Sequence, residues 1–410
     1  MKCGLLGRTL GHSYSPQIHS YLGDYPYALF ERELEDISAF LRKGDFTAIN
    51  VTIPYKKDVM PYCAELTDCA RKMGAVNTIV RRKDGSLIGH NTDYFGLHYT
   101  FNRMGLSLSG KKVLVLGSGG ASVTTVIVLK ELGANVVIIS RSGENNYTNL
   151  HLHKDARLIV NTTPVGMYPN TGISPVDLTN RNSFPCLQAV VDVIYNPART
   201  KLLLDSETNE HIECANGLLM LAAQAKEAAE WFTGRKIPNE IIGNITRTLE
   251  VQMQNIVLVG MPGCGKTTIG KLLAESTGRR FVDTDTEIIK RAGKSIPDIF
   301  AQDGEEAFRD LETEIIETFG RESGLIIATG GGCVTKARNY NLLHQNGTIF
   351  WIQRKTSVLP VQGRPLSQTA DLEEMFRIRQ PLYEHFSDWI VENNANPGAV
   401  AEQIQHILEV

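Results

Sequence analysis

Two glycine-rich turns, each directly after a short apolar run, constrain the fold of this chain more than any other feature. The first lies in KKVLVLGSGGAS at 111–122 and the second in NIVLVGMPGCGKTT at 255–268. Each run is rich in valine, leucine and isoleucine without alternation, which is typical of a strand covered on both faces. Each turn opens into a segment that favours a helix. The sequence therefore predicts an α/β protein with two βα units, each starting a parallel sheet.

The length of the chain predicts several domains, and its charge argues against some classes of partner. At about 100–200 residues per domain, 410 residues predict two or three domains. The 42 Lys and Arg residues against 45 Asp and Glu residues give a net charge of −3. No overall basic field is therefore expected to attract nucleic acid or an anionic membrane, and any anion binding must be local. The expected partners are small molecules, and the sequence leaves the oligomeric state open.

The cysteines and the apolar stretches indicate a cytoplasmic protein. The seven cysteines include no Cys-x-x-Cys pair, so free thiols are expected rather than a disulfide framework or a zinc site. The N-terminal segment MKCGLLGRTLGH has too short an apolar run for a signal peptide. The uncharged stretch from Val113 to Leu129 is interrupted by glycines and serines, which favours a strand, a turn and a helix over a membrane span.

The glycine turns also indicate where the domains begin and end. The residues before the first turn carry their own strand-like and helix-like runs and form a separate lobe. The run from Gly217 to Phe232 is rich in helix formers and ends at Gly234, with Pro238 beyond. A stretch without glycine or proline precedes the second buried strand and is compatible with a continuing helix. The predicted division is a lobe at 1–100, a lobe at 101–216, a helix at 217–244 that returns to the first lobe, a linker at 245–254 and a last domain at 255–410.

The second glycine turn is a complete phosphate-loop pattern, Gly260-x-x-x-x-Gly265-Lys266-Thr267, between a predicted strand and a predicted helix. In this pattern the glycines let backbone N–H groups converge on phosphate oxygens, Lys266 offsets their charge, and the Thr267 hydroxyl binds Mg²⁺. A plain turn before a helix would not need the Gly-Lys-Thr triplet. We interpret Cys264, inside the loop, as a small filler rather than a redox group. The loop predicts ATP and Mg²⁺ as cofactors.

Five further motifs follow the phosphate loop in order. They are Phe281-Val-Asp283-Thr-Asp285, Gly304-Glu305 before Phe308-Arg309, Thr329-Gly330-Gly331-Gly332, Gly363-Arg364-Pro365-Leu366 and Arg379-Gln-Pro-Leu-Tyr383. Together with the loop they resemble the shikimate kinase family across nearly all of 253–410. Arginine forks and a carboxylate near a reacting hydroxyl suit a small polyhydroxy acid, although each arginine taken singly would more often form a surface ion pair.

The kinase resemblance assigns roles to these residues. It implies that Asp285 accepts a hydrogen bond from the attacking 3-hydroxyl, that Lys266 is also catalytic, and that Thr267 and Asp283 support Mg²⁺. The residues that it assigns to the substrate are Arg309, Gly331 and Arg379. Those that it assigns to the nucleotide are Gly263, Gly265, Thr268 and Arg364. Arg364 would lie on a lid that closes on ATP, and the polar, aperiodic stretch from Lys355 to Ala370 separately indicates such a loop.

The first glycine turn, Gly117-Ser-Gly119-Gly120-Ala121-Ser122, matches only part of the dinucleotide fingerprint, because Ser122 stands where a third Gly or Ala is usual. The next predicted strand, 135–139, ends in Ser140-Arg141-Ser142. A ribose 2′-hydroxyl would call for Asp or Glu there, whereas a 2′-phosphate calls for a cation, so the sequence favours NADP(H). A solvated surface Arg141 is the alternative. The region 143–157 is short and leaves little room for the helix that usually follows.

The first hundred residues carry a second series of motifs. They are Gly11-His12-Ser13-Tyr-Ser15-Pro16-x-x-His19, Asn50-Val-Thr52-Ile-Pro54-Tyr-Lys56, Gly74-Ala-Val-Asn77-Thr78 and Gly89-His-Asn91-Thr92-Asp93. Asn161-Thr-Thr-Pro164-Val-Gly166-Met167, Asp192-Val-Ile-Tyr195-Asn-Pro197 and Asn216-Gly217 through Gln224 follow. The series resembles the shikimate dehydrogenase family over residues 1 to about 240. One departure is that Ser140-Arg141-Ser142 replaces the usual Asn-Arg-Thr.

The dehydrogenase resemblance implies a substrate-binding α/β lobe and a Rossmann lobe for NADP. It places Ser13 and Ser15 on the substrate carboxylate with Tyr195 nearby, and it makes Lys56 and Asp93 the catalytic pair. The residues that it assigns to the ring hydroxyls are Thr52, Asn77, Asp93 and Gln224. Those that it assigns to NADP(H) are Gly117, Gly119, Gly120, Ala121, Arg141 and Gly217.

The chemistry of ketone reduction needs a proton donor at the oxygen that becomes negative. A lysine ammonium beside a carboxylate meets this need. Two alternatives stay open, because Asp93 suits a helix cap ahead of a helix predicted at 94–102, and Lys56 suits an exposed loop. Nothing gives the three histidines within the motifs metal-ligand spacing, so they are interpreted as structural or substrate-adjacent; these are His12, His19 and His90.

The sequence thus predicts a bifunctional α/β enzyme, with the two dehydrogenase lobes followed by a P-loop kinase domain built on a parallel sheet. The first part would reduce 3-dehydroshikimate to shikimate with NADPH, and the second would phosphorylate shikimate with ATP. One alternative is a quinate/shikimate dehydrogenase joined to a kinase of a related polyol such as gluconate. Another alternative is a ligand sensor without catalysis. The intact residues of both predicted sites argue against it; these are Lys56, Asp93, Lys266, Thr267 and Asp285.

Overall fold

The computed structural model describes every residue of the chain except 12, 181, 360–371, 395 and 410. The chain forms two compact units. The first unit comprises residues 1–164, 175–195 and 205–248, and the second comprises 165–174, 196–204 and 249–410. Arg364 and 360–370 of the predicted lid lie outside the described residues.

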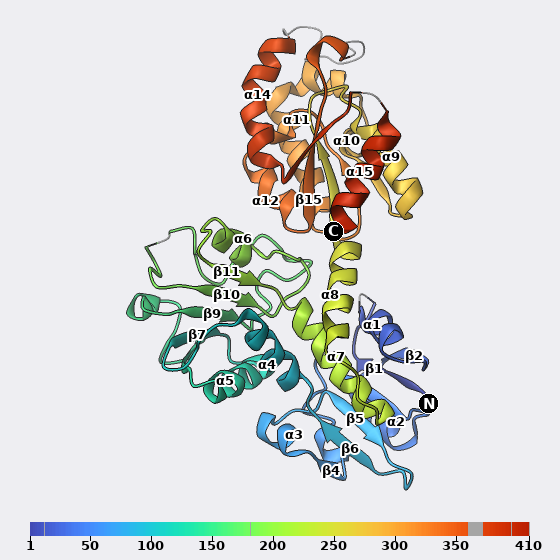
Figure 1. Cartoon of the computed structure of the whole chain (residues 1–410), viewed down its shortest axis with the longest axis vertical. Helices are drawn as coiled ribbons and strands as arrows, with labels where there is room; N and C mark the ends of the chain where they lie inside the picture. The colour runs from blue at the N-terminus through green and yellow to red at the C-terminus, as the bar shows by residue number, and fades with distance from the viewer. Residues whose placement is uncertain (12, 181, 360–371, 395, 410) are drawn as a thin grey trace. The chain divides into compact units, whose positions relative to one another are not determined.

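The first lobe of the first unit is built on a six-stranded mixed sheet of order β2-β1-β3-β5-β6-β4 (Figure 1). Its strands are β1 (Cys3–Gly7), β2 (Tyr27–Glu31), β3 (Ala48–Val51), β4 (Glu65–Leu66), β5 (Thr78–Arg81) and β6 (Leu87–His90), and its helices are α1 (Ser15–Leu22), α2 (Ile37–Lys43) and α3 (Asp68–Met73). β5 runs antiparallel to both β3 and β6, so the end of β3, the start of β5 and the end of β6 meet at one edge. Buried Leu6, Ile49 and Ile79 form part of the core beneath this edge.

The second lobe of the first unit contains a five-stranded parallel sheet of order β11-β10-β9-β7-β8. Its strands are β7 (Lys112–Leu116), β8 (Asn135–Ile139), β9 (Leu158–Asn161), β10 (Ala189–Asp192) and β11 (Glu213–Ala215), with α4 (Asp93–Met104) and α5 (Gly120–Glu131) beside them. The uncharged stretch from Val113 to Leu129 is strand, turn and helix, as predicted. Between β8 and β9 the chain forms only a 3₁₀ turn at Leu150–His153, which confirms that a full helix does not fit there.

A helix pair follows these two lobes. α7 (Leu218–Thr233), which comes after α6 (Lys201–Glu207), packs against α4 and also against α1, β3 and β5 of the first lobe. It ends at Gly234, whose φ of 67° is left-handed, and the chain resumes as α8 (Glu240–Met253) beyond Pro238. The segment predicted as one helix, 217–244, is therefore interrupted, because a left-handed residue and a proline cannot continue a helix. The predicted linker is itself helical, and the division between the units falls within α8.

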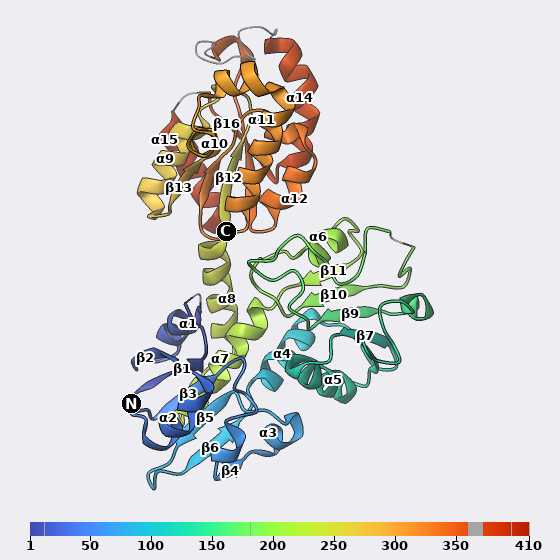
Figure 2. The ribbon, with the colours of Figure 1, turned by 180° about the vertical axis from the view of Figure 1, so that it is seen from behind.

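The second unit is a parallel sheet of order β13-β14-β12-β15-β16 with helices on both faces. Figure 2 shows α9 and α15 on one side and α11, α12 and α14 on the other. The strands are β12 (Asn255–Val259), β13 (Phe281–Asp283), β14 (Ile326–Ala328), β15 (Gly347–Gln353) and β16 (Trp389–Glu392). The helices are α9 (Lys266–Thr277), α10 (Thr284–Ala292), α11 (Ile296–Gly320), α12 (Arg338–His344), α14 (Leu372–Phe386) and α15 (Pro397–Glu409). The predicted fold class, α/β with a parallel sheet in the kinase part, is confirmed.

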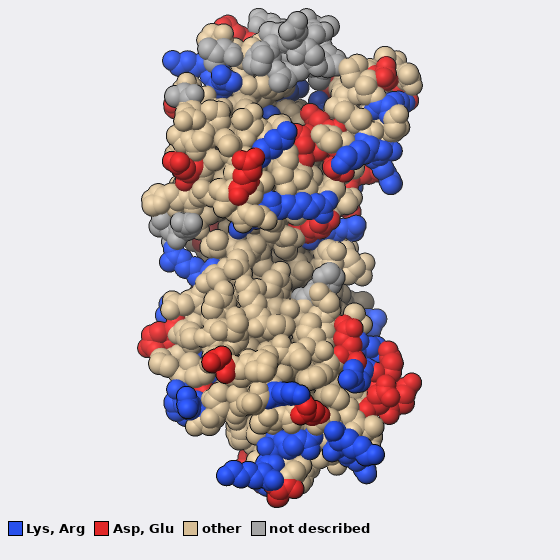
Figure 3. Space-filling model, turned by 90° about the vertical axis from the view of Figure 1, so that its right-hand side faces the viewer, with Lys and Arg blue, Asp and Glu red and all other residues tan. Residues whose placement is uncertain are grey.

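Two surface properties bear on partners. Among the helices of the described residues, none combines the length and the apolar character needed to cross a bilayer. On the face drawn in Figure 3, basic and acidic side chains are interspersed within each unit. This mixing is what a net charge near zero leads us to expect.

Candidate active sites

The sheet edge in the first lobe brings the predicted catalytic pair together. Lys56 lies in the turn after β3, and Asp93 is the first residue of α4, just after β6. The Lys56 Nζ donates to Asp93 Oδ2 at 2.6 Å, and the side chains are 29% and 16% exposed. The pair is thus half-buried and reachable from solvent. Thr92, and not Asp93, occupies the cap position of α4. The Asp93 carboxylate points instead to Lys56 and Asn77, so the cap interpretation is not what the structure has.

Asn77 fixes the other oxygen of the same carboxylate. Its Nδ2 donates to Asp93 Oδ1 at 3.0 Å, and its Oδ1 accepts from the Thr92 backbone N–H at 2.7 Å. The Thr92 hydroxyl donates to Gln224 Oε1, on α7, at 3.3 Å. Asn77, Asp93 and Gln224 are therefore connected, while Thr52 lies at the same sheet edge directly after β3. A carboxylate with both oxygens engaged is held in one orientation.

The predicted carboxylate-binding residues lie at the start of α1. Ser13 Oγ accepts from the Ser15 backbone N–H at 3.2 Å, which closes a tight turn around Tyr14. The ring of Tyr14 meets that of Tyr195 edge to face, with centroids 6.2 Å apart. Burial raises the pKa of both phenols, so both keep their protons and remain donors at neutral pH. The structure thus brings Tyr195, from the second lobe, next to the segment that holds Ser13 and Ser15.

The first glycine turn has one glycine that the backbone requires. Gly117 has φ of 106°, and a Cβ there would lie 2.9 Å from Thr162 Oγ1. Around Gly119 and Gly120, by contrast, a Cβ would meet no described atom within 4 Å, so a ligand can approach the backbone. Ala121 follows in the first turn of α5. The departure at Ser122 is accommodated, because its hydroxyl donates to the Gly117 carbonyl at 2.8 Å.

Two other predicted NADP residues differ in how strongly the structure constrains them. A Cβ on Gly217 would clash with the carbonyl oxygen of Val193, so only glycine allows this approach at the start of α7. Arg141 follows β8 at the carboxyl edge of the parallel sheet and is exposed. Its position suits a nucleotide phosphate and equally suits a solvated side chain.

The phosphate loop of the second unit has the expected strand-loop-helix geometry. Three glycines have positive φ, namely Gly260 at 142°, Gly263 at 83° and Gly265 at 107°. Lys266 is buried, and its Nζ donates to the Gly260 and Met261 carbonyls at 2.8 and 3.0 Å. Thr268 is exposed in the first turn of α9. The lysine thus lies folded against the loop that it follows.

The predicted metal residues meet at the carboxyl ends of β12 and β13. Thr267 Oγ1 donates to Asp283 Oδ2 at 2.8 Å. The other oxygen of Asp283 accepts from the Asp285 and Thr286 backbone N–H groups, capping α10. This cap places Asp285 in the first turn of the helix, beside the turn that follows β14: a Cβ on Gly330 would lie 2.9 Å from its Oδ1.

A buried ion pair fixes the predicted substrate arginine on α11. Arg309 donates to Glu312 Oε2 at 2.7 Å, and it also contacts Glu305 at 3.3 Å. Burial lowers the pKa of Arg309, but the two carboxylates outweigh it and raise the pKa overall. Burial also raises the pKa of Glu312. Glu312 Oε1 has no hydrogen-bond partner among the described residues and would lie against a Cβ on Gly330.

The remaining predicted substrate residues converge on one backbone turn. Arg379, within α14, donates to the Gly331 carbonyl at 3.4 Å, and the Tyr383 hydroxyl donates to the same oxygen at 2.5 Å. A Cβ on Gly331 would clash with Pro262 in the phosphate loop. The structure therefore brings Gly331 and Arg379 together next to that loop, whereas Arg364 lies outside the described residues.

Sequence reasoning missed some residues of both sites. Glu312 stands three residues after Arg309, and this i,i+3 spacing of opposite charges was an available signal. Asn50 lies beneath the first site, where it accepts from the Tyr27 hydroxyl at 2.8 Å and donates to the Asn77 carbonyl at 3.3 Å. No sequence pattern predicts these two contacts, because they join residues from three separate segments of the chain.

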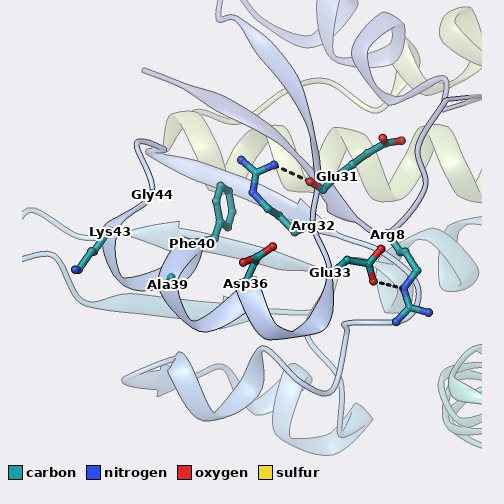
Figure 4. A pocket seen from close by; sticks show the side chains of 9 residues that line it. All are labelled: Arg8, Glu31, Arg32, Glu33, Asp36, Ala39, Phe40, Lys43 and Gly44. Atoms are coloured by element: carbon teal, nitrogen blue, oxygen red, sulfur yellow. Dashed lines mark hydrogen bonds and ion pairs between the residues drawn. The ribbon is translucent and has the colours of Figure 1, made fainter.

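A surface hollow on the first unit contains none of the predicted site residues (Figure 4). It lies between the end of β2 and α2. Arg8 pairs there with Glu33 at 3.3 Å, and Arg32 donates to the backbone carbonyl of Glu31 and covers the ring of Phe40. Both arginines are already engaged, so neither is free to converge on a ligand in this hollow.

Known proteins match both parts of the chain. A family model described as shikimate dehydrogenase substrate binding domain covers residues 5–79, and one described as shikimate kinase covers residues 262–409. The shikimate dehydrogenase (NADP(+)) of Clostridium beijerinckii is 34% identical over 262 residues, which are 58% of this chain and 94% of that protein. The chain belongs to the shikimate dehydrogenase family. Its C-terminal part is a shikimate kinase domain.

Solved structures of shikimate dehydrogenases agree with this assignment. The chorismate mutase/shikimate 5-dehydrogenase fusion protein from Clostridium acetobutylicum is 33% identical with a TM-score of 0.56, over 61% of this chain and 97% of that one. The shikimate 5-dehydrogenase of Thermus thermophilus, in complex with NADP(H) and shikimate, is 28% identical with a TM-score of 0.55, over 60% and 99%. The chain is therefore an enzyme that carries a shikimate dehydrogenase and a shikimate kinase domain on one polypeptide.

Proposed function

We propose that the chain catalyses two consecutive reactions of the shikimate pathway. The first unit would reduce 3-dehydroshikimate to shikimate with NADPH, and the second would transfer the ATP γ-phosphoryl group to the shikimate 3-hydroxyl. The observation that carries the proposal is the Lys56–Asp93 pair, 2.6 Å apart, in a chain similar to shikimate dehydrogenases over nearly their whole length. Relatives named for NADP(+), and one structure bound to NADP(H), support this cofactor.

The residues of the first site account for ketone reduction. NADPH, when bound, supplies the hydride that adds to the carbonyl carbon. The Lys56 ammonium donates a hydrogen bond to the carbonyl oxygen and then the proton that balances the new negative charge. Asp93 holds that ammonium in place and is itself held by Asn77. Ser13, Ser15 and Tyr195 fix the substrate carboxylate at the other end of the ring.

The residues of the second site account for phosphoryl transfer. ATP, when bound, supplies the transferred group. Asp285 accepts a hydrogen bond from the 3-hydroxyl, while Arg309 and Arg379 hold the substrate carboxylate. Lys266 stabilises the phosphate charge by leaving its carbonyl partners for phosphate oxygens. In this arrangement the substrate lies between α10, α11 and the Gly331 turn.

The donor atoms near the phosphate loop fit Mg²⁺. Thr267 Oγ1 and Asp283 Oδ2, which are 2.8 Å apart, are hard oxygen ligands. Among the described residues, no group of three His, Cys, Asp or Glu side chains is close enough to hold a metal by itself. Mg²⁺ commonly takes one or two protein ligands and completes its shell with water and substrate phosphates. Thr267 would bind the ion directly and Asp283 would orient its shell.

Two assays of the full chain test the proposal. The first follows NADPH absorbance with 3-dehydroshikimate, and the second follows ADP release with shikimate, ATP and Mg²⁺. We expect turnover in both. Equal or faster turnover with quinate or gluconate would favour the related polyol specificities instead. Absence of turnover in both assays, from folded protein, would contradict the proposal and favour a ligand sensor.

A further inference from the structure

His90 is a buried titratable residue that the proposed chemistry does not use. It ends β6 and stands three residues before Asp93. Its Nδ1 lies 2.8 Å from Thr67 Oγ1, its Nε2 lies 3.3 Å from Glu227 Oε1, and its ring stacks on Trp231 with centroids 4.4 Å apart. The side chain thus has a partner on each nitrogen and on one face of the ring.

The two hydrogen bonds define one orientation of the ring. A carboxylate such as that of Glu227 only accepts hydrogen bonds, so the Nε2–H group of His90 is the donor in this contact. Thr67 Oγ1 already accepts from the Ala70 backbone N–H at 3.2 Å as the cap of α3. Its hydroxyl proton is therefore available to Nδ1. This arrangement satisfies both partners, and turning the ring over would break both contacts.

The same helix holds both ends of the segment that leads to Asp93. Glu227 and Trp231 on α7 contact His90, and Gln224, one turn earlier on α7, accepts from the Thr92 hydroxyl at 3.3 Å. Between them, the Asn91 Nδ2 donates to the Ala75 carbonyl at 3.0 Å. Each residue from the end of β6 to the start of α4 therefore makes a side-chain hydrogen bond to another element or turn of the first unit.

We propose that His90 is a positioning residue for the dehydrogenase reaction. Together with Thr67, Glu227 and Trp231 it forms a latch, the His90 latch, which fixes β6 to α7 and so holds the Asp93 carboxylate toward Lys56. This inference rests on the proposed function of the first unit. Catalytic groups displaced by about 1 Å can lose roughly 10²-fold in rate, so a partly loosened latch should cost about tenfold.

The first test is the His90→Phe variant of the full chain. Phenylalanine retains an aromatic face for Trp231 but removes both hydrogen bonds. We expect kcat of the dehydrogenase to fall about tenfold, with the KM for 3-dehydroshikimate changed less than about threefold, because the carboxylate-binding residues lie on other elements. Kinase turnover of the same chain should be unchanged. His98→Phe is the same replacement on α4, where the ring hydrogen-bonds to Asn102 and stacks on Tyr94, and it should leave kcat within about twofold.

A double-mutant cycle separates positioning from a general loss of structure. If the latch acts through the Asp93 carboxylate, His90→Phe should cost less than about twofold in an Asp93→Asn background, whereas a structural role would cost the same tenfold in both. Glu227→Ala should reproduce the loss, and Glu227→Gln, which keeps an acceptor, should restore most of it. A wild-type rate in His90→Phe and Glu227→Ala, or full additivity in the cycle, would overturn the inference. A wild-type chain that turns over no dehydroshikimate would overturn the proposed function instead.

Discussion

The two candidate active sites differ in which groups accept hydrogen bonds from their lysines. In the first unit, Lys56 pairs with Asp93, and that carboxylate is also the partner that the proposed reaction needs. In the second unit, Lys266 donates to the Gly260 and Met261 carbonyls of its own loop, and Thr267 donates to Asp283. In the proposed reactions, the first site would be preorganised for a charge that develops during hydride transfer. In the second site, Lys266 would exchange its neutral partners for a polyphosphate that arrives fully charged.

This difference follows from the ligands that the two sites are proposed to bind. A ketone carries no charge at the reacting oxygen, so its site can keep an ion pair assembled and lose little on binding. A polyphosphate brings several charges, and a lysine held by carbonyl oxygens is satisfied without a competing carboxylate that the phosphate would have to displace. The contrast makes distinct predictions for the two lysines.

The largest effect is expected for Lys56→Ala. Without the positioned proton donor, the dehydrogenase rate should fall by roughly 10²–10⁴-fold. The half-buried Asp93 would also lose its counter-charge, so the free energy of unfolding of the first unit should fall by about 1–3 kcal/mol. Turnover of each reaction and urea unfolding measure the two effects. Loss of kinase turnover in a folded variant would contradict the two-site arrangement.

Lys266→Ala should have the converse effect on activity and a different effect on stability. Kinase turnover should fall by a comparable 10²–10⁴-fold while dehydrogenase turnover stays near wild type. Because the described partners of the buried ammonium are the Gly260 and Met261 carbonyls and the Cys264 sulfur, and none is a carboxylate, removing it also removes a desolvation cost. The stability of the second unit should therefore change by less than about 1 kcal/mol or rise. A destabilisation as large as that of Lys56→Ala would show that the two lysines are not held differently.

Sequence patterns predicted the parts of this molecule that depend on local information. The two βα turns, the end of α7 at Gly234 and the missing helix after β8 all follow from residues within one short window, and the structure has them. The break inside α11 is also local, since Gly304 has φ of 86° there, yet a single glycine in a helical pattern is an ambiguous signal.

The rest of the sites depended on contacts between distant segments. Whether Asp93 caps α4 or faces Lys56 is decided by the antiparallel pairing of β5 with both β3 and β6, which no motif encodes. Glu312 was missed although its i,i+3 spacing from Arg309 is a local signal. The interpretation of His90 as structural or substrate-adjacent named no partner, because Glu227 comes next to it only when α7 packs beside β6. The catalytic and binding roles of the predicted residues remain predictions that the variants described here test.

Acid should reduce the free energy of unfolding by an intermediate amount, and this effect of His19 should be confined to the first unit. Burial lowers the pKa of His19 to about 3, with the ring between Tyr27 and Phe232 and Nδ1 2.7 Å from the Tyr25 hydroxyl. Since the unfolded chain binds a proton near pH 6.5 and the folded chain does not until about pH 3, stability is lost as pH falls through this window.

For this single group, the loss between pH 7 and pH 5 is about 2 kcal/mol. Urea unfolding followed by dehydrogenase activity at the two pH values measures it. His19→Phe removes the titrating group and should flatten that dependence, although it also costs the hydrogen bond to Tyr25 at every pH. An unchanged pH dependence in the variant would show that other groups destabilise this unit in acid.

The smallest effect is expected at Arg141, the exposed cation after β8. The phosphate loop surrounds its ligand with backbone donors, a lysine and a hydroxyl, whereas Arg141 offers one side chain to a 2′-phosphate. Losing one charge-assisted hydrogen bond of about 1.4 kcal/mol corresponds to tenfold in affinity. Arg141→Ala should therefore raise the KM for NADP about tenfold and leave the KM for NAD and kcat unchanged, because the side chain lies far from the hydride in this assignment.

Arg103→Ala, which replaces an exposed arginine on α4, is the matched control. Equal KM values for NADP in the two variants would mean that Arg141 is only a solvated side chain, and that NADP is selected elsewhere in the turn.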